Sequence, residues 1–280
     1  MATTNENFTG MLLGLAVGDA LGTTLEFGPR RLLNDLHTEM IGGGVFGLAP
    51  GQWTDDTAMA VAMGRSLVLE KAFRPLRILN EWSEWYLRGK HACTGTCFDI
   101  GNATRSALDA FLKNPTVVPK ISPSSLGNGS LMRLAPVVLF ASTEAEAESL
   151  AYEQSLLSHG EDAATATGWF GKLLFKTATS GFDVASIPPD ISKRKRNAVS
   201  ASGFYKDTLE AAMWAVASTS SFEDAVVQAV NLGDDADTVG AVTGQLAGAI
   251  YGESSIPDRW LDRLAWRNEI KELAEMLIGS

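Results

Sequence analysis

Residues 237–252 read DTVGAVTGQLAGAIYG, with a glycine at every fourth position. Residues 10–22 read GMLLGLAVGDALG and repeat the same spacing. The repeated glycines are Gly14, Gly18 and Gly22 in the earlier stretch and Gly240, Gly244, Gly248 and Gly252 in the later one. Glycine inside a helix costs about 1 kcal/mol relative to alanine, so a packing reason is expected. The spacing predicts two central helices whose backbones cross closely near the functional site, the alternative being small residues that are merely tolerated.

Helical periodicity continues along most of the chain, and strand-like alternation is nearly absent. Residues 144–157, EAEAESLAYEQSLL, carry apolar side chains on one helical face and glutamates on the other. Ser221, with Asp224 three positions later, is typical of a helix start. Helices are predicted over residues 9–22, 55–71, 74–88, 98–113, 129–140, 143–157, 161–178, 205–219, 221–231, 237–251 and 257–278. We therefore expect an all-α fold, a single compact multi-helix bundle of about ten helices in one domain spanning residues 1–280.

The composition is that of an ordinary globular protein, with 45% hydrophobic and 20% charged residues in a chain of 280. The net charge of −10 disfavours a nucleic-acid partner, because such a surface repels phosphate backbones. No secretory signal is predicted, and the longest apolar run, residues 238–251, is interrupted by Thr243 and Gln245, so no membrane span is expected. Cys93 and Cys97 are too few for a disulfide framework, which favours a cytoplasmic location. Because coiled-coil heptads are lacking, we expect a monomer.

Three long irregular stretches separate the predicted helices, at residues 23–54, 114–128 and 179–204. Loops of this length inside a compact domain are often functional. The third stretch contains a basic run, KRKR at residues 193–196. We interpret this run as the solvated face of a loop, and contact with an acidic partner or with phosphates is the alternative.

Two matching acidic groups stand at predicted helix starts. Residues 53–57 read WTDDT, and residues 233–238 read GDDADT. Aspartate and threonine commonly cap helices, so capping is the simpler interpretation of either group alone. A cap needs only one or two side chains, however, and adjacent carboxylates repel each other unless a cation neutralises them. If the two groups meet in space, they form an all-oxygen site suited to Mg²⁺ or Mn²⁺, with enough carboxylates for two such ions.

Six motifs, in this order along the chain, resemble those of the ADP-ribosylglycohydrolase family. They read GMLLGLAVGDALGTTLEF, GQWTDDTAM, CFDIG, GNGSLMRLAPV, SHGEDA and NLGDDADTVGAVTGQLAGAIYG. They span almost the whole chain and are most similar to the bacterial arginine-directed branch, the dinitrogenase-reductase-activating type. The resemblance implies a metal-dependent hydrolase that removes ADP-ribose from modified proteins. It also implies an all-α fold with two Mg²⁺ or Mn²⁺ ions at the bottom of a cleft.

The resemblance also assigns roles to single residues. It implies that the metal ligands are Thr54, Asp55, Asp56, Asp235, Asp237 and Thr238. Asp234 stands where the family often has glycine, so its role is left open. Glu26 matches the family's active-site glutamate, and either it or a cluster aspartate such as Asp56 would act on water. Asp99 matches the acid that faces the scissile bond or the arginine guanidinium, and a helix cap is the alternative.

Further matches concern the binding of ADP-ribose. The contacts that the resemblance implies are Asn128, Gly129, Ser130, Met132, His159, Gly203 and Tyr205. Residues 127–133, GNGSLMR, are by themselves a plausible anion cradle formed by N–H groups at a helix start. A lone histidine such as His159 at a helix start is more often structural, but the family places it in the site. Arg133 could pair with a phosphate or with a neighbouring carboxylate.

The implied reaction is hydrolysis of the N-glycosidic bond between C1 of the ribose and an acceptor nitrogen, through a transition state with oxocarbenium character. Asp99 favours a cationic acceptor, so arginine is preferred. The same site could instead release ADP-ribose from serine, from nucleic acid or from a small ADP-ribosyl ester. A catalytically silent ADP-ribose-binding module is another alternative, although all expected metal ligands and Glu26 are present. A purely structural helical protein would leave the two acidic groups unexplained.

Overall fold

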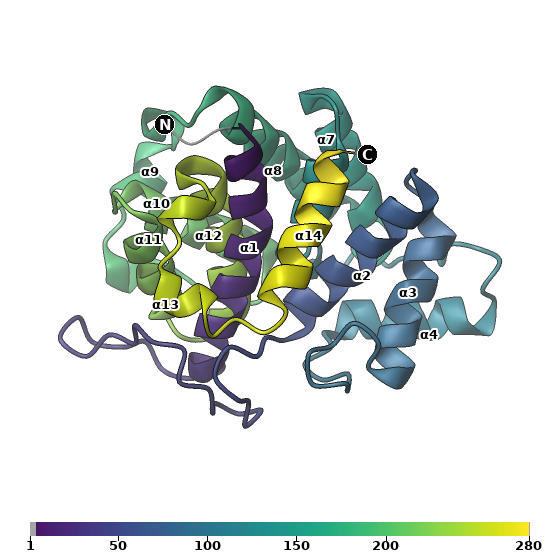
Figure 1. Ribbon diagram of the computed structural model, residues 1–280, viewed down its shortest axis with the longest axis horizontal. Coiled ribbons are helices and arrows are strands. Elements are labelled where there is room, and N and C mark those ends of the chain that lie inside the picture. Colours follow the sequence, from purple (N-terminus) through teal and green to yellow (C-terminus); the bar gives the residue numbers. More distant parts are fainter. Residues whose placement is uncertain (1–3, 280) are drawn as a thin grey trace.

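The computed structural model describes residues 4–279 and shows an all-α fold, as the periodicity predicts (Figure 1). No β-strand occurs within these residues. The α-helices are α1 (Thr4–Gly22), α2 (Asp55–Glu70), α3 (Pro75–Arg88), α4 (Asn102–Lys113), α5 (Gly129–Met132), α6 (Ala135–Phe140), α7 (Glu144–Ser155), α8 (Glu161–Ser180), α9 (Pro189–Ser192), α10 (Tyr205–Ala217), α11 (Phe222–Val230), α12 (Ala236–Tyr251), α13 (Asp258–Leu261) and α14 (Arg267–Ile278). Short 3-10 helices lie at Thr23–Leu25, Val184–Ser186, Arg196–Ala198 and Glu253–Ser255.

Two predicted helices are each divided in the structure, for local backbone reasons. Residues 129–140 form α5 and α6, and Pro136 stands in the first turn of α6. Proline lacks the N–H that a continuous helix would need there. Residues 257–278 form α13 and α14, which are separated at Trp266 by a left-handed φ of 60°. These divisions account for part of the excess of short helices over the predicted number.

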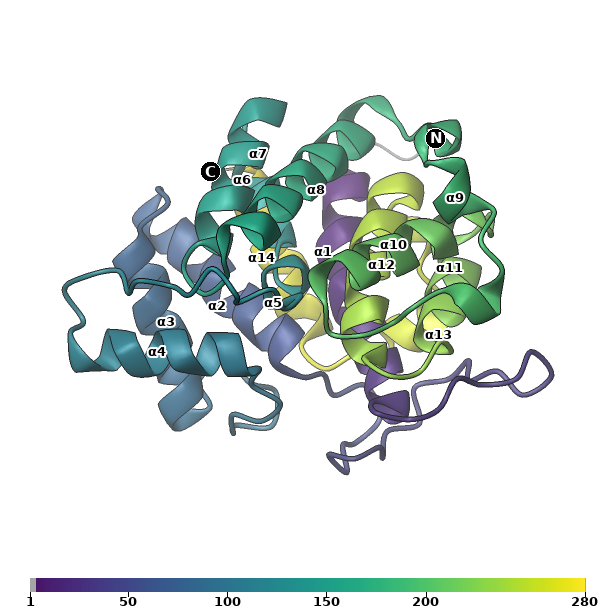
Figure 2. The same ribbon diagram turned by 180° about the vertical axis from the view of Figure 1, so that it is seen from behind.

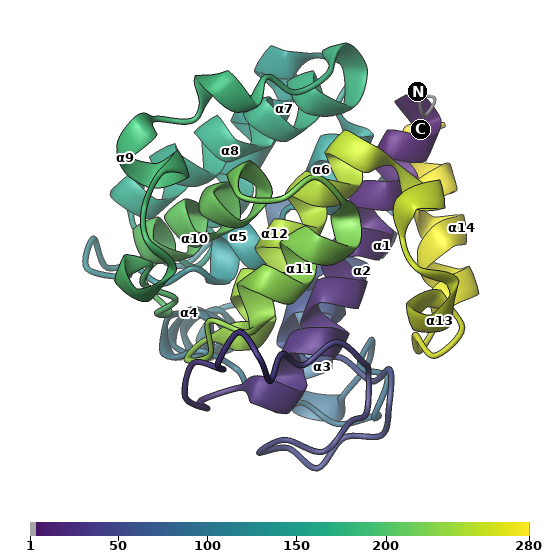
Figure 3. The ribbon, with the colours of Figure 1, turned by 90° about the vertical axis from the view of Figure 1, so that its left-hand side faces the viewer.

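Helices α1 and α12 run antiparallel at the centre of the fold and touch through their backbones (Figure 1, Figure 3). A methyl group on Gly18 would lie 2.0 Å from the carbonyl oxygen of Gly240, and one on Gly14 would lie 2.2 Å from that of Gly244. Only glycine permits this approach, so the packing interpretation is confirmed at these positions. Gly252 has a different role, because it ends α12 with a φ of 80°, a conformation that other residues avoid.

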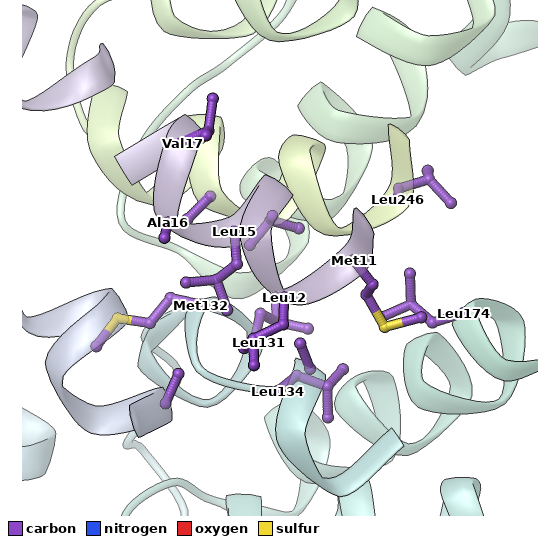
Figure 4. Close-up of a cluster of buried hydrophobic side chains, with 14 of the residues drawn as sticks. Met11, Leu12, Leu15, Ala16, Val17, Leu131, Met132, Leu134, Leu174 and Leu246 are labelled. Carbon is purple, nitrogen blue, oxygen red and sulfur yellow. The ribbon is translucent and has the colours of Figure 1, made fainter. Parts of the chain in front are cut away.

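The remaining faces of α1 pack against α6, α8 and α14. Met11 and Leu12 are buried there, in one cluster of apolar side chains that includes Leu134 and Leu174 (Figure 4). The segment Thr4–Leu25 is long and apolar enough to cross a membrane by length and composition alone, but 89% of its most apolar window is buried inside the protein. We therefore interpret α1 as the core helix of the bundle.

Arginine side chains tie the long loop after α1 to the loop before α10. Arg30 donates to the carbonyl oxygen of Arg196, and Arg196 donates to that of Arg31. Arg194 forms an ion pair with Glu210, with 2.7 Å between nitrogen and oxygen. The interpretation of the basic run as a solvated face is therefore wrong for two of its four residues, because Arg196 joins the two loops and Arg194 joins the second loop to α10.

Candidate active site and metal centre

The two acidic groups of the sequence meet in the structure, at the end of the fold where α1 finishes (Figure 1). Helix α12 starts there because it runs antiparallel to α1, and α2 starts there as well. The hydroxyl oxygen of Thr54 lies 3.3 Å from a carboxylate oxygen of Asp237 and 3.4 Å from one of Asp56. Thr54 and Asp237 are 183 positions apart, so spacing along the chain could not show this meeting.

Asp19, near the end of α1, supplies the cap of α2. Its carboxylate is fully buried and accepts hydrogen bonds from the N–H and hydroxyl groups of both Thr54 and Thr57, at 2.6 to 3.0 Å. Four donors thus converge on one carboxylate and fix the first turn of α2, from which the acids of the first group project. This role was not predicted. The signal was nevertheless present, because a lone carboxylate in the apolar run of residues 10–22 must find partners when it is buried.

Replacing Asp19 with asparagine is expected to lower the free energy of unfolding by about 2 kcal/mol, because an amide has a single acceptor oxygen and leaves buried donors unpaired. Urea unfolding followed by circular dichroism measures this change, and a chelator in the buffer removes any contribution from bound metal. An unfolding midpoint equal to that of the wild type would contradict the capping role.

Glu26 caps α12 in the same manner, from the turn that follows α1. Its Oε2 accepts hydrogen bonds from the N–H groups of Ala236 and Asp237, at 2.7 and 3.3 Å. The side chains of Thr54 and Asp235, which precede the first turns of α2 and α12, make no capping bond. Capping therefore does not account for the two acidic groups, although Oδ1 of Asp237 accepts one hydrogen bond at the start of α12, from the N–H of Thr238 at 2.7 Å. The other side-chain capping bonds at these two helix starts come from Asp19 and Glu26, outside the two groups.

Carboxylates crowd the place where the groups meet. Glu26, Asp99 and Asp237 offer oxygen atoms that all lie within 4.8 Å of one another. Burial, and then repulsion from neighbouring acids, raises the pKa of Glu26, Asp55 and Asp56 well above the usual range. Burial and then Asp99 raise the pKa of Asp237 to about 7. The folded chain by itself therefore disfavours the ionised forms, which a bound cation would favour.

The donor atoms fit a hard divalent cation. Oδ1 of Asp56 is buried and has no hydrogen-bond partner among the described residues. The other carboxylate oxygen of Asp56 lies 3.4 Å from the hydroxyl of Thr54. Burial, and then the nearby carboxylates of Asp19, Asp237 and Asp55, raise the pKa of Asp56. In residues 4–279 no lysine or arginine lines the adjoining cavity. A partnerless buried oxygen among like charges, without a protein cation, is an arrangement that Mg²⁺ or Mn²⁺ would complete.

A cavity of about 520 Å³ adjoins these acids, a size usual for a small-molecule site. The predicted residues that line it are Glu26, Asp55, Asp99, Asn128, Gly129, Met132, His159, Gly203, Asp235 and Thr238. The residues that line it without having been predicted are Phe27, Gly101, Asn102, Ala103, Thr104, Ser106, Ser124, Ser125, Leu126 and Gly127. The last four belong to the segment that returns from the far end of α4 to α5 (Figure 2). Of these four, Gly127 belongs to the predicted anion cradle, and only the length of the loop had indicated a function for the other three.

Asn128 serves the acidic group as well as the cavity. Its Nδ2 donates to Oδ2 of Asp235 at 2.7 Å and to the hydroxyl of Thr208 at 2.8 Å. Its N–H donates to the carbonyl oxygen of Gly203 at 3.0 Å. The amide therefore orients a predicted metal ligand. The helix that follows, α5, is a single turn of four residues, so a helix dipole adds little to the predicted anion cradle.

The turn after α1 and the loop before α12 are joined through their main chains. The N–H of Phe27 donates to the carbonyl oxygen of Asp234 at 2.7 Å, and the N–H of Asp234 donates to that of Gly28 at 2.9 Å. Phe27 and Asp234 both adopt left-handed backbone conformations, with φ of 57° and 60°. Such strain is typical of functional sites. The pairing gives Asp234, whose role was left open, a backbone function.

Asp99 also has a left-handed φ, of 58°, and the helix predicted to start at residue 98 begins only at Asn102. A helix cap at Asp99, the alternative interpretation, is therefore wrong. Phe98 beside it packs on Phe46, with 5.1 Å between ring centroids, and Phe46 packs on Phe27 at 6.3 Å. These three rings form an aromatic rim that connects Asp99 to the cavity-lining Phe27.

Known proteins resemble the chain over its whole length. The family model for ADP-ribosylglycohydrolase matches residues 1–280. The chain belongs to the ADP-ribosylglycohydrolase family. The resemblance of the six motifs is thereby confirmed, and so is the all-α fold that this ADP-ribosylglycohydrolase was expected to have.

Two relatives and one solved structure are similar to this ADP-ribosylglycohydrolase over almost its whole length. ADP-ribosylarginine hydrolase Tri1 of Pseudomonas putida (strain GB-1) is 41% identical, over 96% of this chain and 76% of its own length. ADP-ribosyl-[dinitrogen reductase] glycohydrolase of Rhodospirillum rubrum is 32% identical, over 96% of this chain and 95% of its own length. A solved ADP-ribosylglycohydrolase-related protein complex contains a chain that superposes with a TM-score of 0.83 at 35% identity and covers 100% of this chain and 99% of its own.

Five predicted site residues of this ADP-ribosylglycohydrolase lie outside the cavity lining. The metal-ligand candidates Thr54, Asp56 and Asp237 are buried next to it. The hydroxyl of Ser130 is fully buried and lies 2.9 Å from that of Thr167, so the structure does not place this side chain at the cavity. Tyr205 begins α10 and packs against its neighbour Phe204, at 4.7 Å between ring centroids. A shared motif fixes the position of a residue in the chain, but not the direction of its side chain.

Proposed function

We propose that this ADP-ribosylglycohydrolase releases ADP-ribose from arginine side chains of modified proteins and that it uses two bound Mg²⁺ or Mn²⁺ ions. The observation that carries the proposal is the meeting of two acidic groups, 183 positions apart, beside a cavity of about 520 Å³. The relatives support the reaction class, since one is named an ADP-ribosylarginine hydrolase and the other an ADP-ribosyl-[dinitrogen reductase] glycohydrolase.

The surroundings of Asp99 support a planar cationic acceptor. Asp99 lines the cavity, half-buried, next to the aromatic rim of Phe27, Phe46 and Phe98. A carboxylate can accept two hydrogen bonds from a guanidinium, and aromatic rings stack on guanidinium planes. A serine acceptor carries no charge and would use neither feature, so this side of the cavity favours arginine.

The reaction is hydrolysis: water adds to C1 of the ribose, the C1–N bond breaks, and the acceptor nitrogen departs with a proton. Bound cations would fix the ribose hydroxyls and lower the pKa of a bound water. Glu26, held by the main-chain N–H groups of Ala236 and Asp237, would orient or deprotonate the attacking water. Asp99, on the side of the aromatic rim, would stabilise the departing guanidinium.

The test is the release of ADP-ribose from an arginine-linked protein substrate, with a serine-linked substrate in parallel. We expect release from the arginine linkage in the presence of Mn²⁺ or Mg²⁺ and a fall to the uncatalysed rate when a chelator is added. Readdition of either ion should restore the rate, which separates loss of metal from loss of protein.

Two other outcomes would redirect the proposal. Release from serine alone would keep the metal site and overturn the choice of acceptor. Binding of ADP-ribose without hydrolysis of either linkage would favour a binding module. The presence of every predicted metal ligand and of Glu26 argues against such a module.

A further inference from the structure

Arg133, which follows α5, is entirely buried and has only neutral hydrogen-bond partners among the described residues. Its guanidinium donates to Oε1 of Gln154 at 3.0 Å and to the hydroxyl oxygen of Ser158 at 2.6 Å. It also stacks on the ring of Trp82, at 4.0 Å from the ring centroid. Direct pairing with a neighbouring carboxylate, one of the two partners predicted for Arg133, is therefore wrong, although the charge of Asp55 acts on the guanidinium. The buried cation polarises the groups that accept its hydrogen bonds.

Ser158 connects this cation to a histidine of the cavity lining. Its hydroxyl oxygen lies 2.8 Å from Nδ1 of His159. A guanidinium has only donors, so the serine oxygen must accept from Arg133. Within residues 4–279 the one remaining partner of this hydroxyl is Nδ1 of His159, which is thus the acceptor available to the serine proton. If Nδ1 carried a proton instead, the buried serine proton would have no acceptor.

His159 is thereby left with its proton on Nε2. The ring is 2% exposed and lines the cavity, and a methyl group on Gly129 would lie 3.2 Å from Nε2. No hydrogen bond to Nε2 occurs in the part of the chain that the structure describes. Burial and then the charge of Arg133 lower the pKa of His159 to about 3, so the ring stays neutral near pH 7. A neutral N–H beside a cavity, without a protein acceptor, is suited to an acceptor on a ligand.

We propose that Arg133 and Ser158 are positioning residues that hold His159 as a neutral Nε2–H donor directed at an acceptor oxygen of the ADP-ribosyl group. The identity of this ligand rests on the proposed function, whereas the position of the proton is a property of the free protein. Phosphate and ribose hydroxyl oxygens are both acceptors, and either would accept from Nε2–H.

The experiment records the ring nitrogens of the ¹⁵N-labelled free protein by NMR, which is practicable because the chain has three histidines. Two variants of matched size test the link. Ser158→Asn keeps an acceptor for Arg133 and a donor for Nδ1, whereas Ser158→Asp keeps the acceptor and removes the donor. We expect the proton on Nε2 in the wild type and in the asparagine variant, and on Nδ1 in the aspartate variant. In calorimetry, ADP-ribose should bind the aspartate variant about tenfold more weakly than the asparagine variant.

A wild-type spectrum with the proton on Nδ1, or with both ring nitrogens protonated at pH 7, would overturn the proposal, and this result requires no variant to fold. Identical His159 signals from the two variants would overturn the role of Ser158. The experiment also separates failure of the positioning role from failure of the proposed function. If the wild type has the proton on Nε2 but does not bind ADP-ribose, the positioning role stands and the proposed function fails. If the wild type has the proton on Nδ1 but releases ADP-ribose, the positioning role fails and the proposed function stands.

Discussion

Replacing Asp237 with asparagine is expected to slow the release of ADP-ribose about a thousand-fold or more, the order found when a group that acts on the reacting centre is removed. Asp237 stands where the two acidic groups meet. It offers an oxygen within 4.8 Å of those of Glu26 and Asp99, and its Oδ2 lies 3.3 Å from the hydroxyl of Thr54. The amide preserves the shape of the side chain but removes a charged ligand for a cation. Steady-state rates on an arginine-linked substrate at saturating Mn²⁺ measure the loss.

The same variant is expected to be at least as stable as the wild type when metal is absent. Burial and then Asp99 raise the pKa of Asp237 to about 7, so its charge is unfavourable in the folded chain, and a neutral amide removes that cost. Mn²⁺ should raise the Tm of the wild type by mass action and leave that of the variant nearly unchanged. Thermal unfolding with a chelator and with Mn²⁺ measures both effects. A variant that is clearly less stable without metal would show that the carboxylate holds the fold.

Asp234→Asn is the matched control for this experiment. Asp234 lies three positions before Asp237, in the loop that leads into α12, is exposed, and is joined to Phe27 and Gly28 through main-chain atoms alone. Its left-handed φ of 60° is one that asparagine adopts readily. We expect near-normal turnover from this variant. An equal loss in both variants would mean that the conformation of the loop, rather than a lost ligand, is responsible.

The positions of the longer helices could be predicted because their signals are local. The helix predicted over residues 143–157 is observed as Glu144–Ser155. The helix start predicted at Ser221 is confirmed, because the hydroxyl of Ser221 accepts a hydrogen bond from the N–H of Asp224 at 3.0 Å. The break at Trp266 could not be predicted, because tryptophan carries no local preference for a left-handed φ. Tertiary packing accompanies it, because the Trp266 ring meets that of Trp53 edge to face, with 5.2 Å between ring centroids.

The candidate site was predictable in its chemistry but not in its connections. Paired acids at two helix starts indicated an all-oxygen site, because capping alone does not need so many carboxylates. Which acids cap and which face the cavity depends on contacts between distant segments, as in the 35 positions that separate Asp19 from Thr54. The link from Arg133 to His159 is of the same kind. It passes through Ser158, which lies in the SHGEDA motif, but the motif does not show that its hydroxyl bridges Arg133 and His159.

Alanine at Gly18 is expected to lower the free energy of unfolding by about 3 kcal/mol or more, at the upper end of the range for overpacked positions. The added methyl carbon would lie 2.0 Å from the carbonyl oxygen of Gly240 and 2.3 Å from its carbonyl carbon. These are backbone atoms of a central helix and have no rotamer into which they can withdraw, so α1 and α12 must separate. Because α12 begins at the acidic groups, the separation should also disturb the cavity. Urea unfolding measures the loss, and soluble expression shows whether the variant folds at all.

Gly64→Ala in α2 distinguishes this backbone contact from a general effect of altering a buried helical glycine. Alanine has a helix propensity about 1 kcal/mol more favourable than that of glycine. This contribution to the free energy of unfolding is the same in both variants. At Gly64 the new methyl carbon would meet only the ends of flexible side chains, at 3.0 Å from Leu273 and 3.4 Å from Leu277. Those side chains can shift by a few tenths of an ångström, and we expect stability to change by less than about 1 kcal/mol. A similar large loss at both positions would show that the tight packing extends to all buried glycines and that the α1–α12 contact is not the special constraint on this fold.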